Sequence, residues 1–249
     1  MSRMKFMNTE IDNLTMQETL QAIDRLIQED RSAYVVTPNV DHIVQLETSK
    51  ELQAVYENAS LILTDGKPLL WIAKWYGTPI KEKISGSDLF PLLCDMAAKK
   101  GYKMFFLGAA EGVAAKAAEN LANKFKGLQV VGTYSPPFGF EKNQDEMDKI
   151  KSMIKEAAPH ILIVGLGCPK QEKFMYHHCK ELGVPISFGL GASFDFEAGN
   201  IKRAPRWMSN HGLEWLFRIT QDPKRMAKRY LVDDRKILGL AIKYRKENR

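Results

Sequence analysis

Short apolar runs of strand length recur along this 249-residue chain, and each of the first five precedes a segment with the apolar spacing of a helix. The runs are AYVVTP, LILT, KMFFLG, LQVVGTY, HILIVGLG and PISFGLG, and helical spacing follows in residues 42–57, 67–76, 111–125, 143–157 and 169–182. Continuous apolar strands that alternate with helices are typical of a mainly parallel sheet. The pattern therefore predicts a Rossmann-like α/β fold with helices on both faces of the sheet.

The loops that follow these strands are rich in small and polar residues. They read TPNVDH, TDGKP, LGAAEG, GLGCPKQE and GLGASFDFEAGN. In parallel sheets, ligands bind beyond the carboxyl ends of the strands, in the loops that lead into helices. Glycine lets a ligand approach the backbone closely, and a helix N-terminus offers free N–H groups to an anion. The loops therefore predict a phosphate-bearing ligand, and a nucleotide is the natural candidate.

Two familiar nucleotide motifs are incomplete in these loops. GLGCPK begins like the dinucleotide motif, but Lys170 stands where the third glycine is needed. GAAEG, from Gly108 to Gly112, lacks the lysine and the hydroxyl of a P-loop. An oxidoreductase and an ATPase are therefore disfavoured. For Gly108 two interpretations stay open, namely close packing at a helix start and contact with a phosphate.

The side chains that commonly bind metal ions show no convincing metal-site spacing. Cys94, Cys168 and Cys179 contain no CxxC pair, which argues against a zinc site and a disulfide framework. Asp195 belongs to a DFE stretch that resembles an acidic metal clamp, but alternate residues of an extended segment point to opposite sides. We therefore expect no metal and no cofactor. The charge of a diphosphate would be met by N–H groups and basic side chains.

Asp65 ends one of the apolar runs and directly precedes a glycine. Asp-Gly is a common turn pair, so the carboxylate could simply shape the turn or cap the next helix. Alternatively, a carboxylate at the carboxyl end of a strand, close to other ligand loops, is well placed to act as a general base. The residues alone leave both interpretations open.

The formal charge of +6 is distributed unevenly. Residues 202–249 contain 14 Lys or Arg and 5 Asp or Glu, so this segment carries +9 and the rest of the chain about −3. We therefore expect a core at residues 1–201 and a basic helical appendage at residues 202–249. Within the appendage an apolar stripe lies beside the basic positions. The stripe consists of Met226, Tyr230, Leu231, Ile237, Leu238, Ala241 and Ile242.

Such an amphipathic segment suits more than one role. It could pack on the domain with a solvated outer face, or dock on an anionic membrane surface, which we favour. Its exposed apolar surface could also promote homo-oligomerisation without a membrane. Basic and aromatic side chains together would suit nucleic acid as well, but this alternative leaves the strand-end loops unexplained. We expect no nucleic-acid partner.

No apolar run approaches the roughly 20 residues that cross a bilayer. The N-terminal MSRMKFMNTEIDNLTMQ has no apolar core and no small-residue cleavage site, so export is not expected. We expect a cytoplasmic protein that is peripheral on the inner face of the cytoplasmic membrane.

Taken together, the loops resemble the sequence blocks of the WecG/TagA/CpsF glycosyltransferases. The resemblance runs from about residue 8 to residue 235 and rests on TPNVDHIV, LTDGKPLLW, ISGSDLF, FFLGAAEGVA, VGLGCPKQEKF, GASFDFEAGNIKRAPRWM and GLEWLFRITQDPKRMAKRY. It implies an inverting, metal-independent transfer of a sugar, often N-acetylmannosamine, from a UDP-sugar to a polyprenyl-diphosphate-linked GlcNAc-type acceptor in surface-polymer assembly. N-acetylmannosaminuronic acid, glucose and glucuronic acid remain alternative donor sugars.

The resemblance also implies roles for individual residues. Asp65 is the implied catalytic base, and the other implied site residues contact substrate: Thr37, Asn39, Lys83, Gly108, Gln171, Gly191, Asp195, Arg218, Arg225 and Arg229. The three arginines are expected to close over the site and meet the diphosphate, and Lys228 is an alternative to Arg229. The family usually carries an arginine where this chain has Lys83, and lysine keeps the charge but loses the bidentate fork.

Overall fold

The computed structural model describes residues 3–247, and contacts within the chain divide it into two units. Unit 1 contains the residues up to Met16, Thr37–Ser85 and the residues from Lys202 onward. Unit 2 contains Gln17–Val36 and Gly86–Ile201. The basic segment that begins at residue 202 thus shares its contacts with two earlier stretches of the chain.

Unit 2 contains parallel strands in the order β3-β8-β7-β5-β6. The strands are β3 (Ala33–Val36), β5 (Lys103–Gly108), β6 (Gln129–Tyr134), β7 (Ile161–Gly165) and β8 (Ile186–Gly189). The helices are α1 (Met16–Glu29), α5 (Gly86–Lys100), α6 (Val113–Lys124), α7 (Gln144–Ala157), α8 (Lys170–Leu182) and α9 (Gly191–Ala198), with a 3₁₀ turn η1 (Phe140–Lys142).

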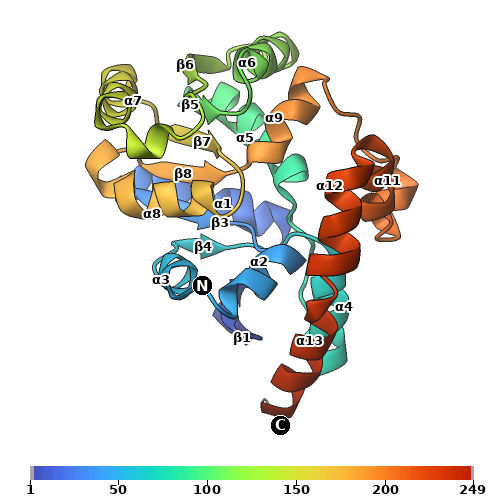
Figure 1. The fold of residues 1–249 in the computed structure, drawn as a ribbon. Helices are drawn as coiled ribbons and strands as arrows, with labels where there is room; N and C mark the ends of the chain where they lie inside the picture. Colours follow the sequence, from blue (N-terminus) through green and yellow to red (C-terminus); the bar gives the residue numbers. More distant parts are fainter. Residues whose placement is uncertain (1–2, 248–249) are drawn as a thin grey trace. The chain divides into compact units, whose positions relative to one another are not determined.

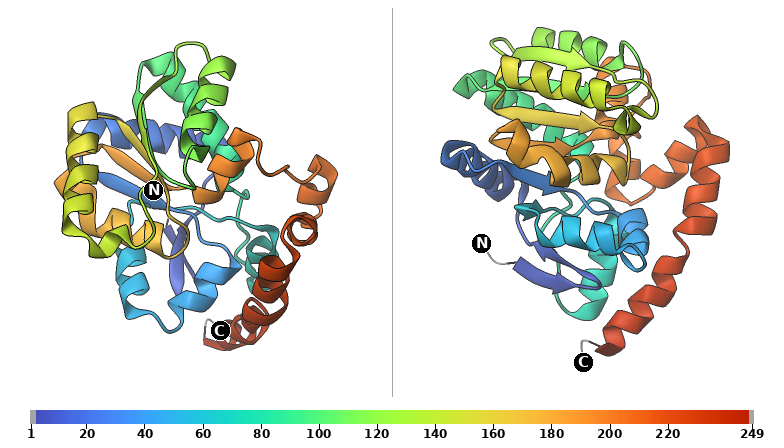
Figure 2. Two further views of the ribbon diagram at one scale, coloured as in Figure 1. Left: turned by 45° about the horizontal axis from the view of Figure 1, so that its top comes forward. Right: turned by 60° about the vertical axis from the view of Figure 1, so that its left-hand side comes forward.

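Helices cover both faces of this sheet (Figure 1, Figure 2). α7 and α8 pack on one face, and α5, α6 and α9 pack on the other. Phe90, Phe106 and Phe194 form an aromatic core beneath the second group, with ring centroids 5.2 to 5.7 Å apart. The prediction of a mainly parallel Rossmann-like α/β fold with helices on both faces is therefore confirmed.

Unit 1 combines short strands with helices from both ends of the chain. Its strands are β1 (Arg3–Phe6), β2 (Thr9–Asp12) and β4 (Leu61–Ile62). Its helices are α2 (Val40–Leu46), α3 (Lys50–Glu57), α4 (Lys67–Tyr76), α10 (Arg206–Asn210), α11 (Glu214–Gln221), α12 (Pro223–Ala227), the π-helical η2 (Lys228–Asp233) and α13 (Lys236–Glu247). None of the described helices is both long enough and apolar enough to cross a bilayer.

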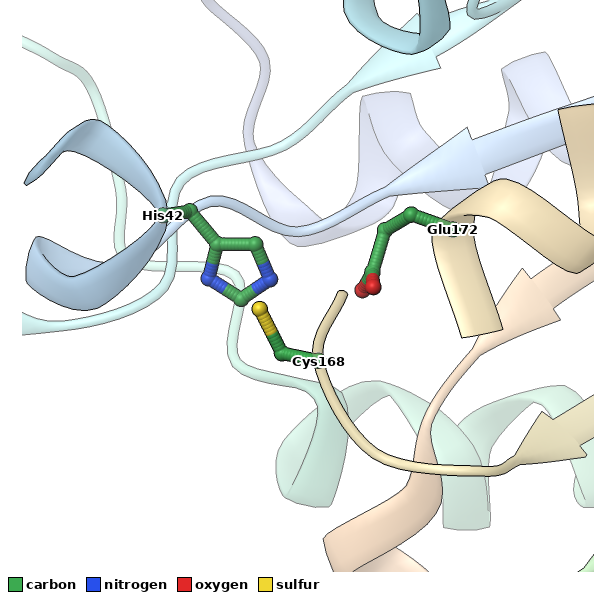
Figure 3. Close-up of side chains that lie close together, drawn as sticks. All are labelled: His42, Cys168 and Glu172. Carbon is green, nitrogen blue, oxygen red and sulfur yellow. The ribbon is translucent and has the colours of Figure 1, made fainter. Parts of the chain in front are cut away.

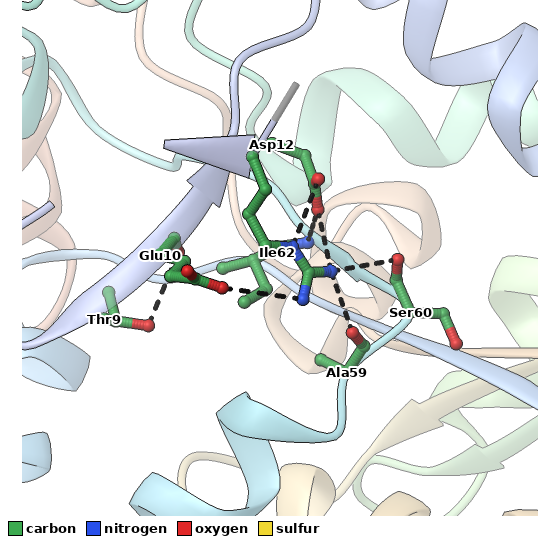
Figure 4. Close-up of polar contacts among 7 residues, drawn as sticks. Thr9, Glu10, Asp12, Ala59, Ser60 and Ile62 are labelled. Carbon is green, nitrogen blue, oxygen red and sulfur yellow. Dashed lines mark hydrogen bonds and ion pairs between the residues drawn. The ribbon is translucent and has the colours of Figure 1, made fainter. Parts of the chain in front are cut away.

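A buried carboxylate holds the strand that leads to Asp65 (Figure 4). Asp12 of β2 accepts a hydrogen bond of 2.9 Å from the backbone N–H of Ile62, and it forms an ion pair with Arg3 at 3.2 Å. The Arg3 guanidinium also donates to the carbonyls of Ala59 and Ser60. The pairing with Arg3 compensates the cost of burying the Asp12 charge. The same network ties β4 to the β1–β2 hairpin and thereby fixes the position of the carboxyl end of β4.

Two local expectations are wrong. Residues 42–57 do not form one helix, because α2 ends at Leu46 and Ser49 caps a new helix by accepting from the N–H of Leu52 over 3.2 Å. The DFE stretch is not extended, because Asp195 lies within α9. Phe194 and Phe196 alternate as they would in a strand, but Phe194 packs into the aromatic core from a helix.

The apolar stripe of the basic segment is divided between two environments. Met226, Ile237 and Ala241 are buried, whereas Leu231, Leu238 and Ile242 are exposed. One part of the stripe therefore packs within unit 1, and the other part faces outward.

Candidate active site

Three loops of unit 1 are tied together by backbone hydrogen bonds. The N–H of Asp65 donates to the carbonyl of Pro38 over 2.8 Å, and the N–H of Ile84 donates to the carbonyl of Thr64 over 2.8 Å. The loops at residues 37–39 (TPN), 64–66 (TDG) and 83–85 (KIS) thus lie beside one another. This arrangement gathers Thr37, Asn39, Asp65 and Lys83, which the sequence resemblance had marked separately.

A cavity of about 430 Å³ opens beside these loops, and all of its lining residues belong to unit 1. Its charged lining residues are Lys67, Lys83, Arg218, Arg229 and Arg235 against Asp65, Glu214 and Asp234. Its apolar lining residues include Val40, Pro68, Trp215, Leu231, Ile237 and Leu238. The cavity therefore offers three carboxylates, a surplus of cationic groups and an apolar wall. Among the carboxylates, Glu214 is paired with Arg218, and the half-buried Asp65 is the one that closely follows a strand.

Arg229 joins the basic segment to the TPN loop. Its Nη2 donates to Asn39 Oδ1 over 3.2 Å and lies 3.5 Å from an Asp41 carboxylate oxygen. Its buried Nε has no hydrogen-bond partner among the described residues. Asn39 caps α2 and also lies 2.9 Å, Oδ1 to Nδ1, from the ring of His42. Arg229 is thus held on one side and keeps a donor for a ligand.

Arg218 is the second cation that the basic segment brings to the cavity. Its Nη2 lies 2.7 Å from Glu214 Oε1 within α11. Burial opposes the guanidinium charge, but Glu214, Tyr230 and Asp65 more than offset this and raise the pKa of Arg218 above its ordinary value. Arg218 therefore stays charged within electrostatic reach of Asp65.

The remaining predicted residues of the appendage differ in their placement. Arg225 stands on α12, but its side chain lies outside the described part of the chain. Lys228, the alternative to Arg229, is exposed and is not among the residues that line the cavity. Thr37 is buried next to the lining residue Asn39 without lining the cavity itself.

The other predicted site residues lie in unit 2, at the end of β5 or in the helices that follow β7 and β8. Gln171 is buried in the first turn of α8 and packs against Gly189 and Gly191, where added Cβ atoms would lie 2.8 and 2.9 Å from its amide. Its Nε2 donates to Glu172 over 2.8 Å, while its buried Oε1 has no partner among the described residues. Asp195 lies on α9, with its carboxylate 3.5 Å from the Asn200 amide.

Gly108 is a position that only glycine can occupy. Its φ is +110°, and a Cβ there would lie 2.4 Å from the carbonyl oxygen of Gly165. The packing interpretation from the sequence therefore accounts for this glycine. Gly108→Ala is expected to destabilise the fold, and a drop of several degrees in the thermal unfolding midpoint would be its signature.

A second cavity, of about 900 Å³, lies in unit 2 at the carboxyl ends of β5, β6 and β7. The N–H groups of Ala110, Glu111 and Gly112, at the start of α6, have no hydrogen-bond acceptor among the described residues. Phe138 is 99% exposed at its rim, with Lys170 Nζ 4.8 Å from the ring centroid. Phe138 carries no site signal in the sequence, because its proline-rich loop matches no recognised motif.

Lys170 also pairs with Glu141, another lining residue of this cavity, at 2.5 Å. Its ammonium group holds the pKa of the Glu141 carboxyl below the ordinary value. The charged lining residues are thus Lys170, which is paired with Glu141, and Glu111. The exposed aromatic ring and the backbone N–H groups are the features of this cavity that suit a base and a phosphate.

Figure 3 draws His42, Cys168 and Glu172, three side chains of types that bind metals. His42 belongs to α2 of unit 1, whereas Cys168 and Glu172 belong to unit 2, in the loop before α8 and in its first turn. Within its own unit, His42 contacts Asn39, and Glu172 accepts from Gln171. Metal-independent chemistry stays a prediction, tested below.

Comparison with known proteins places the chain in a family. The model of the glycosyl transferase WecG/TagA/CpsF family matches residues 4–249. The chain is similar to an N-acetylglucosaminyldiphosphoundecaprenol N-acetyl-beta-D-mannosaminyltransferase of Bacillus spizizenii, with 34% identity over 80% of this chain and 75% of the relative. A protein of the same name from Bacillus subtilis is 29% identical over 80% of this chain and 75% of its own length.

Proposed function

Because the chain belongs to the WecG/TagA/CpsF family and is therefore a glycosyltransferase, we propose that it moves N-acetylmannosamine from a UDP-sugar to a polyprenyl-diphosphate-linked GlcNAc acceptor, with inversion. The observation that carries the proposal is the position of Asp65 in a cavity that is both cationic and apolar. The two relatives are named for this acceptor and this sugar, which supports the same choice here.

The unit 1 cavity suits the acceptor because a lipid-linked diphosphate has two chemically different parts. The diphosphate is a dense anion, and Arg218, Arg229 and Lys83 offer charge-assisted hydrogen bonds to it. The first isoprene units are apolar and match the wall formed by Trp215 and Leu238. A cavity for a simple soluble sugar would not need that wall.

The chemistry then needs one base and a stabilised leaving group. In an inverting transfer, the acceptor hydroxyl attacks the anomeric carbon from the face opposite the diphosphate of the donor. Asp65 accepts the hydroxyl proton, the new glycosidic bond forms, and the old bond breaks with its electron pair on UDP. Basic side chains and backbone N–H groups stabilise the negative charge on UDP, so no metal ion is required.

We assign the nucleotide part of the donor to the unit 2 cavity. Phe138 offers a face on which a base can stack, and the N–H groups that precede α6 suit phosphate oxygens.

Base stacking is worth about 1–3 kcal/mol, so Phe138→Ala should weaken UDP binding by roughly tenfold. Titration of UDP by calorimetry measures this, with Leu92→Ala, an exposed side chain on α5, as the control. An unchanged dissociation constant for Phe138→Ala would remove the assignment.

The basic segment adds the link to the lipid. We propose that residues 202–249 close over the site and hold the protein on the inner face of the cytoplasmic membrane, where the acceptor is anchored. The exposed Leu231, Leu238 and Ile242 support this role, because they lie among basic side chains.

The proposed function is tested with purified protein, a panel of UDP-sugars and a short-chain polyprenyl-diphosphate-GlcNAc. We expect acceptor-dependent release of UDP, fastest with UDP-N-acetylmannosamine among donors that include the glucose and uronic acid forms. The rate should be the same with and without EDTA. Absence of UDP release with every donor would contradict the function, and loss of the rate in EDTA would contradict the metal-independent mechanism.

A further inference from the structure

Large exposed apolar side chains are concentrated in unit 1. Among the described residues, unit 1 contains Trp71, Trp75, Trp207, Trp215, Leu216, Leu231, Leu238 and Ile242, and unit 2 contains only Leu92, Val131 and Phe138. Trp71 and Trp75 stand out because they belong to α4, far in sequence from the basic segment. Their exposed fractions are 56% and 45%. Tryptophan at such exposure calls for a partner.

α4 has one face that packs and one that does not. Leu69 and Ala73 are fully buried, whereas Trp71, Lys74 and Trp75 are exposed. Residues four apart lie on the same face of a helix, so the two tryptophans form a short ridge. Lys74, beside this ridge, has no ion-pair partner among the described residues. The outer face of α4 therefore combines aromatic side chains with a free cation.

The last helix, α13, lies against α4 within unit 1. The Tyr76 hydroxyl donates to the carbonyl of Ala241 over 2.7 Å, and burial raises the pKa of Tyr76 to about 12, so the hydroxyl stays a donor. The guanidinium carbon of Arg245 lies 4.1 Å from the ring centroid of Trp75. These contacts fix the two helices side by side, as Figure 1 also shows.

The exposed stripe of α13 lies on the flank that meets Trp75. At 3.6 residues per turn, Leu238, Ile242 and Arg245 fall within about 60° of one another around the helix. Since Arg245 stacks on Trp75, this flank is continuous with the tryptophan ridge. Leu238 and Ile242 are 70% and 53% exposed. Two helices that are far apart in sequence thus present one apolar surface.

The side chains of this surface indicate which kind of partner it binds. Tryptophan prefers the boundary between the lipid tails and the headgroups, and lysine side chains extend from such a boundary to anionic headgroups. Lys74 and Lys246 are exposed beside this surface and have no ion-pair partner among the described residues. The same face of a second copy of this chain would bring like charges together, whereas an anionic bilayer neutralises them.

We propose that Trp71 and Trp75 of α4, together with Leu238 and Ile242 of α13, form a bilayer-docking surface for anionic membranes. This inference rests on the proposed function in one respect, because a membrane-anchored acceptor gives such a surface its purpose. It extends membrane contact beyond the basic segment to a helix of the N-terminal half.

The surface also borders the unit 1 cavity. Gly212 and Lys67 line that cavity, and a Cβ on Gly212 would lie 2.7 Å from the Trp71 ring and 3.2 Å from the Lys67 Cβ. Docking through Trp71 therefore places one wall of the cavity at the bilayer surface. A lipid-linked diphosphate could then reach the cationic side chains while its chain stays in the membrane.

Co-sedimentation with phosphatidylglycerol vesicles tests the inference without any turnover. Trp71→Ser/Trp75→Ser and, on the other helix, Leu238→Ser/Ile242→Ser should each weaken vesicle binding by about tenfold or more. Leu92→Ser/Val131→Ser, a matched double change at exposed side chains of unit 2, should bind as the parent protein does. Circular dichroism verifies that each variant is folded.

Neutral phosphatidylcholine vesicles should bind the parent protein much more weakly, because the lysines then have no counter-charge. Parent-level binding by the folded tryptophan variant would overturn the inference. So would a parent protein that self-associates through these helices in sedimentation experiments and ignores vesicles. If vesicle binding behaves as expected but no UDP-sugar is used, the proposed function fails while the docking surface stands.

Discussion

Asp65→Asn is expected to lower kcat for sugar transfer by about 10²- to 10⁴-fold, the usual contribution of a general base. Asparagine keeps the shape of the side chain but cannot accept the proton of the acceptor hydroxyl. The loop itself should be unaffected, because it is held by the backbone hydrogen bond from Asp65 to Pro38. Release of UDP at saturating donor and acceptor measures the effect.

The matched control is Asp95→Asn. Asp95 lies on α5 of unit 2, where its carboxylate forms an exposed ion pair of 2.6 Å with Lys99. Exposed pairs of this kind contribute little, so this variant should turn over normally. A folded Asp65→Asn protein with the same kcat as Asp95→Asn would exclude Asp65 as the base.

Arg218→Met is expected to lower kcat/KM by about 10²- to 10³-fold, as the loss of one strong donor to a charged group does. Methionine replaces the aliphatic stem but not the guanidinium that lies in the cavity near Asp65. Arg218→Lys should recover part of the loss, because lysine keeps the charge without the bidentate fork. Initial rates at varied acceptor concentration separate the effect on KM from the effect on kcat.

Arg31→Met serves as the control for this series, because Arg31 is an exposed arginine of unit 2. Thermal unfolding shows whether the loss of the Glu214 pair affects stability. A stable Arg218→Met protein with unchanged kcat/KM would exclude the proposed contact with the acceptor diphosphate.

Much of the fold could be predicted from the sequence, because local signals and tertiary packing agree. α4 begins and ends where the apolar spacing places it, at residues 67–76, since Gly66 and Pro68 mark its start and the left-handed Gly77 marks its end. The break after α2 was missed, because the apolar spacing continues across Ser49 and only its capping bond reveals two helices. The helical Asp195 was missed because Phe194 and Phe196 mimic a strand.

Five of the residues that the resemblance implies for the site meet at one cavity, although only Asn39 and Asp65 closely follow a strand, and their roles stay predictions. Asn39, Asp65, Lys83, Arg218 and Arg229 line one cavity, although the basic segment is far away in sequence. Phe138 was missed, because the sequence does not show that its exposed ring lies at the rim of a cavity. The tryptophan ridge of α4 was missed for a related reason. Amphipathic spacing shows that a helix has two faces, but only packing shows that Ala73, and not Trp71, lies on the buried one.

The most direct test of the account is a crystal structure of the protein with a short-chain polyprenyl-diphosphate-GlcNAc. The account predicts the acceptor hydroxyl at hydrogen-bond distance from the Asp65 carboxylate, about 2.6–3.2 Å, with the diphosphate on Arg218 and Arg229. An Asp65 carboxylate that is turned out of the cavity, with the acceptor hydroxyl on another residue, would contradict it.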